Sequence, residues 1–246
     1  MSRVRLVFFV VAGLVGCGFA PAAGTDAAPG GDARRDGMVP IPIVFVREAV
    51  TTAGNGNTVT TSLSTQDAGD SLIAVVSWTN NTGAVMSMVD TLGNTWTSAA
   101  PVDHSGQLSL QIWWTANIAA GGNKVTAMIS NNVNAPKLRL FEYSGLAKVA
   151  PVDGTSTAST SDVGAMLTVS STGPVATTNA HDLLFAANVA TRSTTGIAPG
   201  YTQRQIDNGN VAIDQEVTAT GTYTASATLA QSASWVMTLV AFKGER

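Results

Sequence analysis

The chain has 246 residues, a formal net charge of −3 at pH 7 and 12% charged residues, where about 25% is usual in globular proteins. No basic run follows residue 35, which excludes a nucleic-acid-binding protein held by phosphate contacts. The only cysteine is Cys17, so a disulfide framework and a thiolate metal site are excluded as well.

The N-terminus combines two arginines with an apolar run over residues 6–15, a pattern typical of a secretory signal. The run is too short to span a bilayer, which requires about 20 apolar residues. It ends in Leu14-Val15-Gly16-Cys17, which resembles the bacterial lipobox, whose cysteine is acylated and becomes the mature N-terminus. We therefore expect residues 1–16 to be a lipoprotein signal peptide and Cys17 to carry a lipid anchor to the membrane.

The alternative is ordinary cleavage near Ala20-Pro21-Ala22, which would leave a soluble secreted protein. Gly18 follows the cysteine, and by resemblance to enterobacterial sorting the absence of Asp there permits the outer membrane. Residues 17–40 are rich in Ala, Gly and Pro and lack apolar periodicity, which predicts a flexible tether. We expect an exported protein that is lipid-anchored at the outer membrane or cell surface.

Residues 41–150 consist of short runs of apolar, Thr and Ser residues separated by Gly and Asn, which favours strands and turns. The continuous apolar run at residues 72–78 is typical of a buried central strand. The expected strands are 41–46, 58–64, 72–78, 85–90, 95–99, 108–114, 124–130 and 138–143.

The same pattern continues through residues 151–246, after a short joint at residues 151–154. No stretch shows a sustained helical period. The expected strands are 165–171, 183–189, 201–205, 210–218, 221–228 and 234–242.

The two halves echo each other. AGDSLIAVVSW at residues 68–78 returns as AHDLLFAANVA at 180–190, and LFEYSG at 140–145 returns as LVAFKG at 239–244. The difference in residue number between matching positions is smaller for the LFEYSG stretch than for the AGDSLIAVVSW stretch, so the second copy has shorter loops. About six short strands per copy favour an all-β fold of two tandem antiparallel β-sandwiches, Ig-like or jelly-roll-like. The alternative is one large sandwich made of two halves.

Several stretches resemble a β-rich repeat module of bacterial secreted and surface proteins, often found beside Ig-like or fibronectin-like domains. They are AGDSLI, VDTLGNTWT, QIWWTANIA, LFEYSGL and WVMTLVAFK, and the resemblance covers residues 43–243. The family offers no catalytic residues to transfer. The resemblance implies an extracytoplasmic module with a binding or adhesive role.

Groups that could support chemistry are few. The two histidines, His104 and His181, lie in polar segments without a second histidine at ligand spacing, so solvated loop positions are favoured over a metal site. No nucleophile elbow accompanies the many serines. We expect no catalytic residue, no metal and no cofactor.

Acidic residues occur in two places of interest, within a predicted strand and around Gly209. Glu142 lies within a predicted strand, either as a buried carboxylate with a raised pKa or, as we favour, at an edge or paired with Arg139 or Lys137. Acidic residues also surround Gly209, where a calcium ion would need six or more oxygens. Because their spacing matches no known loop motif, a solvated acidic face is favoured; these residues are Asp207, Asp214 and Glu216.

The strongest lead is Trp113. Strand alternation places Leu108, Leu110, Ile112 and Trp114 on one face and Ser109, Gln111 and Trp113 on the other. The echoing strand presents Ala212, Asp214 and Glu216, so we expect this second face to be solvent-exposed. Trp113, Gln111 and Ser109 are therefore the candidate ligand-binding residues, for a glycan or a protein. The alternative is that the other copy covers Trp113.

These observations favour a non-catalytic cell-surface lipoprotein with a binding or adhesion role. The alternative function is a structural component of the envelope or extracellular matrix, and the third is a hydrolase with an unrecognised site. An exposed aromatic platform would indicate binding, whereas a smooth Thr/Ser surface over buried aromatics would indicate a structural role.

Overall fold

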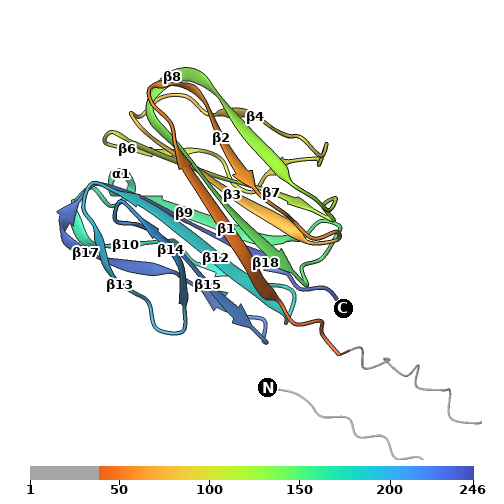
Figure 1. Cartoon of the computed structure of the whole chain (residues 1–246). Helices are drawn as coiled ribbons and strands as arrows, with labels where there is room; N and C mark the ends of the chain where they lie inside the picture. The colour runs from red at the N-terminus through yellow and green to blue at the C-terminus, as the bar shows by residue number, and fades with distance from the viewer. Residues whose placement is uncertain (1–38) are drawn as a thin grey trace, which may run out of the picture. The chain divides into compact units, whose positions relative to one another are not determined.

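The computed structural model describes residues 39–246, in which nearly every regular element is a β-strand (Figure 1). The one helix among them is the four-residue α1 (Thr160–Val163). The first-half strands are β1 (Val44–Thr52), β2 (Gly56–Leu63), β3 (Ser71–Thr79), β4 (Val85–Asp90), β5 (Thr97–Ser98), β6 (Asp103–Ser105), β7 (Leu108–Ala116) and β8 (Asn123–Ser144). The second-half strands are β9 (Val152–Ser159), β10 (Leu167–Ser171), β11 (Val175–Ala176), β12 (Asp182–Ala190), β13 (Thr194–Ile197), β14 (Thr202–Asp207), β15 (Asn210–Val217), β16 (Thr222–Tyr223), β17 (Ser226–Ala233) and β18 (Trp235–Lys243).

The first half is built around β8, a strand of 22 residues that belongs to two sheets. Its first part pairs with β2 and β4 in a small sheet, and its second part pairs with β1 and β3 in a large sheet ordered β1-β8-β3-β7-β5. The change of sheet occurs near Ala135, which has a φ of 47°, and the following Pro136, which has no N–H to donate. One strand therefore ties both layers of the first sandwich together.

The second half also has a large sheet and smaller sheets, built from separate strands. Its large sheet is ordered β9-β18-β12-β15-β14, and its small sheets are β10-β17-β13 and the pair β11-β16. The two echoing apolar stretches form β3 and β12, each flanked on both sides within its large sheet. Matched in this way, the two large sheets have the same strand order. Close superposition of the copies stays a prediction of the repeat.

Burial on both sides explains the continuous apolar runs. In β3, Leu72 and Ala74 pack in the core under the small sheet, whereas Ile73 and Val75 pack against the second half. A third core lies under the small sheets of the second half. The all-β sandwich expectation is confirmed. Each half is a sandwich, and the two large sheets pack face to face, giving the order small, large, large and small.

The contact between the large sheets is centred on aromatic rings. The ring of Phe141 lies 5.1 Å from that of Phe185, and Tyr143 meets Phe185 edge-on at 6.3 Å. Phe45 in turn lies edge-on to Tyr143 at 5.5 Å. Such geometries are favourable beyond the burial of area alone. The two halves therefore share one apolar core.

Several boundaries differ from the sequence expectation. The strands expected at 124–130 and 138–143 are parts of the single strand β8, because residues 131–134 continue in extended pairing. The expected joint at 151–154 already begins β9, an edge strand paired with β18. Its Thr, Ser and Gly residues carry no apolar alternation, so hydrogen bonding to β18 defines this strand rather than its own pattern.

We expect Phe185→Ala to lower the free energy of unfolding by about 3–5 kcal/mol, because it leaves a cavity in the shared core. Since both halves contribute to that core, the wild type and the variant should each unfold in one calorimetric transition. Differential scanning calorimetry of residues 39–246 measures this. Two resolved transitions, with only one shifted by the substitution, would show instead that the halves are independent.

Candidate functional site

Two of the three residues on the Trp113 face are buried and Trp113 itself is half-buried, so the expected solvent exposure of this face is wrong. Ser109 is 0% exposed, Gln111 is 6% exposed, and Trp113 packs against the core of the first sandwich. The small sheet covers this face. The strand register shows that Trp113 was matched to the wrong residue of the second half. Trp114 lies opposite Ile73 in the first half, and Asp214 lies opposite Phe185 in the second. If Ile73 and Phe185 correspond, Trp113 corresponds to Ile213, a core residue, and not to Glu216.

The two polar residues of this face bind the protein itself. Gln111 Oε1 accepts the backbone N–H of Val85 at 2.9 Å, which links the large sheet to the small one. Ser109 Oγ donates to the carbonyl of Asn80 at 2.6 Å and lies 2.6 Å from His104 Nδ1. These contacts are structural, and the hypothesis of an aromatic binding platform at Trp113 loses its basis.

We expect Trp113→Ala to lower the free energy of unfolding by about 2–4 kcal/mol, because the indole fills part of a core. The matched control is Met86→Ala, since Met86 is 66% exposed on β4 of the covering small sheet and should change stability little. Denaturant titration of both variants measures the difference. Equal stability of the two variants would contradict the packing of Trp113 against the core.

The histidines are not the solvated loop residues that were expected. His104 lies in β6 and is half-buried beside Ser109. His181 is 6% exposed, and its Nε2 lies 2.6 Å from Glu216 Oε1. Each histidine therefore contacts a partner within its own half of the fold. His104 contacts the hydroxyl of Ser109, and His181 contacts the carboxylate of Glu216.

Glu142 lies in a carboxylate cluster, and the favoured edge position or pairing with Arg139 or Lys137 is wrong. Its carboxylate is wholly buried, and burial raises its pKa although the Asp67 N–H and Arg47 lower it. Arg47 Nε lies 2.9 Å from Glu142 Oε2, and a second guanidinium nitrogen lies 2.9 Å from Asp67 Oδ2. With Asp70, these carboxylates lie within 4.8 Å of one another. Arg47 offsets part of the negative charge of the cluster and fastens the loop before β3 to β1.

The acidic residues around Gly209 take three separate partners, so they form neither a shared ion site nor one solvated face. Asp207 forms an ion pair with Lys137. Asp214 is 2% exposed and accepts bonds from Tyr143 Oη at 2.6 Å and Arg204 Nε at 2.7 Å. The third, Glu216, contacts His181 as described. Asp207 and Asp214 both reach across to β8 of the first half.

A pair of neighbouring carboxylates that no sequence pattern predicts is formed by Asp153 and Asp182. Asp182 is 0% exposed, and burial together with neighbouring Asp153 raises its pKa to about 6, although a hydrogen bond from Asn179 lowers it. Burial also acts on Asp153, but bonds from Thr178 and Asn179 lower its pKa to about 2. Lys243 Nζ lies 3.5 Å from Asp153. Near pH 5 the pair therefore holds one proton, on Asp182.

We expect Asp182→Asn to stabilise the protein at pH 8 but not at pH 3.5. The folded-state pKa of about 6 lies above the ordinary pKa of 3.8 that applies in the unfolded chain, so protonated Asp182 favours folding, and this contribution is lost as pH rises between those values. Asn mimics the protonated acid at every pH, so the gain should reach up to about 3 kcal/mol above pH 6. Chemical denaturation of both proteins from pH 3.5 to 8 measures it. A difference independent of pH would refute the assignment.

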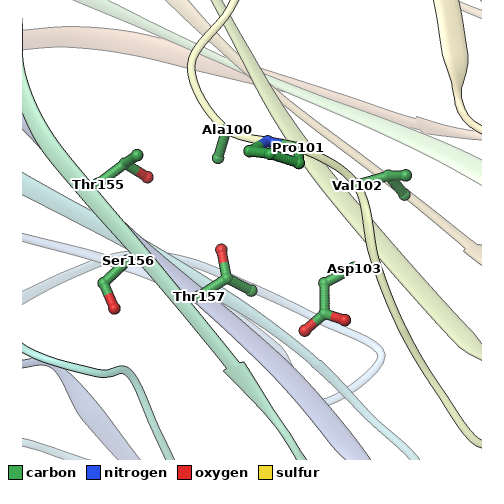
Figure 2. Close-up of a pocket in the computed structure, with 7 residues that line it drawn as sticks. All are labelled: Ala100, Pro101, Val102, Asp103, Thr155, Ser156 and Thr157. Carbon is green, nitrogen blue, oxygen red and sulfur yellow. The ribbon is translucent and has the colours of Figure 1, made fainter.

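Two pockets open along the seam between the halves. The larger, of about 300 Å³, lies between the segment before β6 and the edge strand β9 (Figure 2). Figure 2 shows Thr157 and Asp103 on facing walls, with Pro101 and Ala100 above them. Its lining is mixed polar and apolar: Ala100, Pro101, Val102, Asp103, Thr155, Ser156 and Thr157. We call this pocket the seam groove.

The hydroxyl groups of the seam groove are held in fixed positions. Thr155 Oγ1 donates to the carbonyl of Leu239 at 3.2 Å, and Thr157 Oγ1 lies 3.0 Å from Thr238 Oγ1. The groove contains a single carboxylate, Asp103, and no other ionisable side chain. It can offer oriented hydroxyls and a small apolar wall to a ligand, which is the chemistry of binding rather than of acid–base catalysis.

A comparison with protein-family models finds no match, and comparisons with curated proteins and with solved structures find none either. The resemblance to a bacterial surface module therefore stays a prediction. Cys17, the signal peptide and most of the tether lie outside residues 39–246. Among those residues, no helix combines the length and apolar character that a membrane crossing requires.

Proposed function

We propose that this protein is a surface lipoprotein that binds a glycan or protein ligand without catalysis. The observation that carries the proposal is the seam groove, because residues from both halves form its walls (Figure 2). Ligand sites occur preferentially where two packed units meet. A groove with one carboxylate lacks the paired acids of a glycoside hydrolase.

The lipobox-like ending of the apolar N-terminal run supports a membrane anchor at Cys17. The anchor places the folded unit on a membrane through the tether of residues 17–40. The net charge of −3 and the scarcity of lysine and arginine disfavour nucleic acid as a partner.

The second candidate function is a structural component of the envelope or extracellular matrix. It is favoured by the burial of the aromatic side chains: Trp78 and Trp235 are at most 2% exposed, Trp96 is 9% exposed, and Trp113 and Trp114 pack against cores. A structural protein needs no exposed aromatic platform for a ligand, so this burial is compatible with a structural role. Binding through the seam groove is what separates the two candidates.

We expect Cys17→Ser to move the protein from the membrane fraction to the soluble exported fraction, because the acylated residue is removed. Detergent partitioning of whole cells, followed by mass spectrometry of the mature N-terminus, measures this. A variant that partitions into detergent as the wild type does would disprove the anchor.

We expect residues 39–246 to bind a subset of a glycan array or of whole cells, and Pro101→Trp to weaken that binding at least about tenfold by filling the groove. The matched control is Val149→Trp, since Val149 is 84% exposed and lies outside the groove. Equal binding by both variants would remove the groove from the proposal. An absence of binding to any probe would favour the structural alternative.

A further inference from the structure

The seam groove runs along the edge of a β-strand. Thr155, Ser156 and Thr157 are consecutive in β9, so their side chains point alternately to opposite faces of the strand. All three nonetheless line the groove. A groove that touches both faces of a strand is bordered by its edge, where backbone N–H and C=O groups point outward. Within residues 39–246, β9 pairs on one side only, with β18.

This edge lacks the features that protect exposed strands from further pairing. Natural sheets protect their edges with charged side chains, proline or bulges. The edge strands β1 and β14 each contain a shift of register and charged residues, among them Arg47 and Arg204. In β9 the shift and the single charge, Asp153, lie at its start. Residues 154–159 pair with β18 without interruption and include no charge and no proline.

The opposite wall of the groove is formed by a break in the neighbouring edge of the first half. β5 ends opposite Trp113 of β7, and β6 begins opposite Leu110. The four residues 99–102 therefore stand opposite only two, 111–112. The surplus leaves the sheet, as in a β-bulge, and Pro101 within it has no N–H with which to rejoin the ladder. The break leaves a space of about 300 Å³ open beside β9 (Figure 2).

The chemistry of the groove favours an extended polypeptide over a sugar. A strand edge offers N–H and C=O groups to another strand, which lies about 4.8 Å away when it pairs. Among the described residues, no aromatic side chain lines the groove, so a sugar ring has none to stack on. The one ionisable side chain is Asp103, across from Thr157 (Figure 2). A carboxylate has about four acceptor sites, which suits a basic side chain of a ligand.

We propose that the seam groove binds an extended peptide segment of a partner protein, which adds to β9 as a further strand of the second-half large sheet. The backbone of the segment pairs with residues 154–158, and a lysine or arginine of the segment binds Asp103. The segment has no proline at the paired positions, because proline cannot donate to the ladder. This inference rests on the proposed function and narrows its ligand to a polypeptide.

The test is selection from a random heptapeptide library displayed on phage, with the purified full chain as bait. We expect the selected peptides to be rich in β-branched residues, to carry a lysine or arginine at a constant position and to lack proline. A synthetic copy of the strongest peptide should lose about tenfold or more in affinity when alternate backbone amides are N-methylated, because methylation removes the donors of the added strand. Isothermal titration measures both peptides.

Matched lysine substitutions test where the peptide binds. Thr155→Lys places a cation on the exposed edge of β9 and should weaken binding of the same peptide by about tenfold or more. The control is Thr195→Lys on the edge strand β13, since Thr195 is also exposed and its hydroxyl, like that of Thr155, donates to a backbone carbonyl. Asp103→Asn should abolish the preference for the basic peptide over a copy with glutamate at the basic position.

Hydrogen exchange of the wild-type complex gives a readout that does not depend on any variant. Alternate amides of residues 154–158 should exchange more slowly when the peptide is bound. Unchanged exchange, equal binding by both lysine variants, or no effect of N-methylation would overturn the proposal. Protection already present without peptide would assign the edge to the tether or to a second copy, and would overturn it too. If glycans bind in the groove and no peptide is selected, the proposed function stands and this inference fails; if neither binds, both fail.

Discussion

The apolar contact between the two large sheets is the interaction on which the rest of this structure depends. Each large sheet is covered on one face by its own small sheet and on the other by its counterpart, around Phe141 and Phe185. Without that contact, Ile73, Val75 and Leu110 would expose a broad apolar face to water. The two sandwiches are therefore complete only together, although each has its own inner core.

The same contact determines where charge can be placed. Polar side chains that enter it are bonded across the seam, as Tyr143 is to Asp214 and Lys137 is to Asp207. Both pairs join β8 of the first half to the second half. A buried polar group is tolerated when it is bonded in this way, and the exceptions are informative. Arg139 is such an exception, and it is the only arginine or lysine described as wholly buried in residues 39–246.

Much of the architecture follows from local patterns, whereas the site does not. The apolar run of β3 and its echo in β12 identify central strands, because only a strand buried on both faces is apolar throughout. Because the large sheet of the first half is covered on both faces, the polar face that carries Trp113 is not exposed either. Alternation tells which residues share a face, but not that a small Thr-rich sheet covers the polar one. The partners of Glu142, Arg47 and Asp67, and the carboxylate beside Asp182, Asp153, lie far from them in the sequence, and no sequence spacing encodes these contacts.

The placement of the chain ends has a mechanical consequence. The N–H of Ile41 bonds to the carbonyl of Glu245, so both ends of the folded unit meet where β1 begins (Figure 1). The smaller pocket at the seam includes Thr52, at the opposite end of the same strand. A pull between the tether and a ligand in that pocket would run along β1, across hydrogen bonds that lie perpendicular to it. The ladder between β1 and β8 would then be loaded in shear, with all its bonds sharing the force, rather than opened one bond at a time.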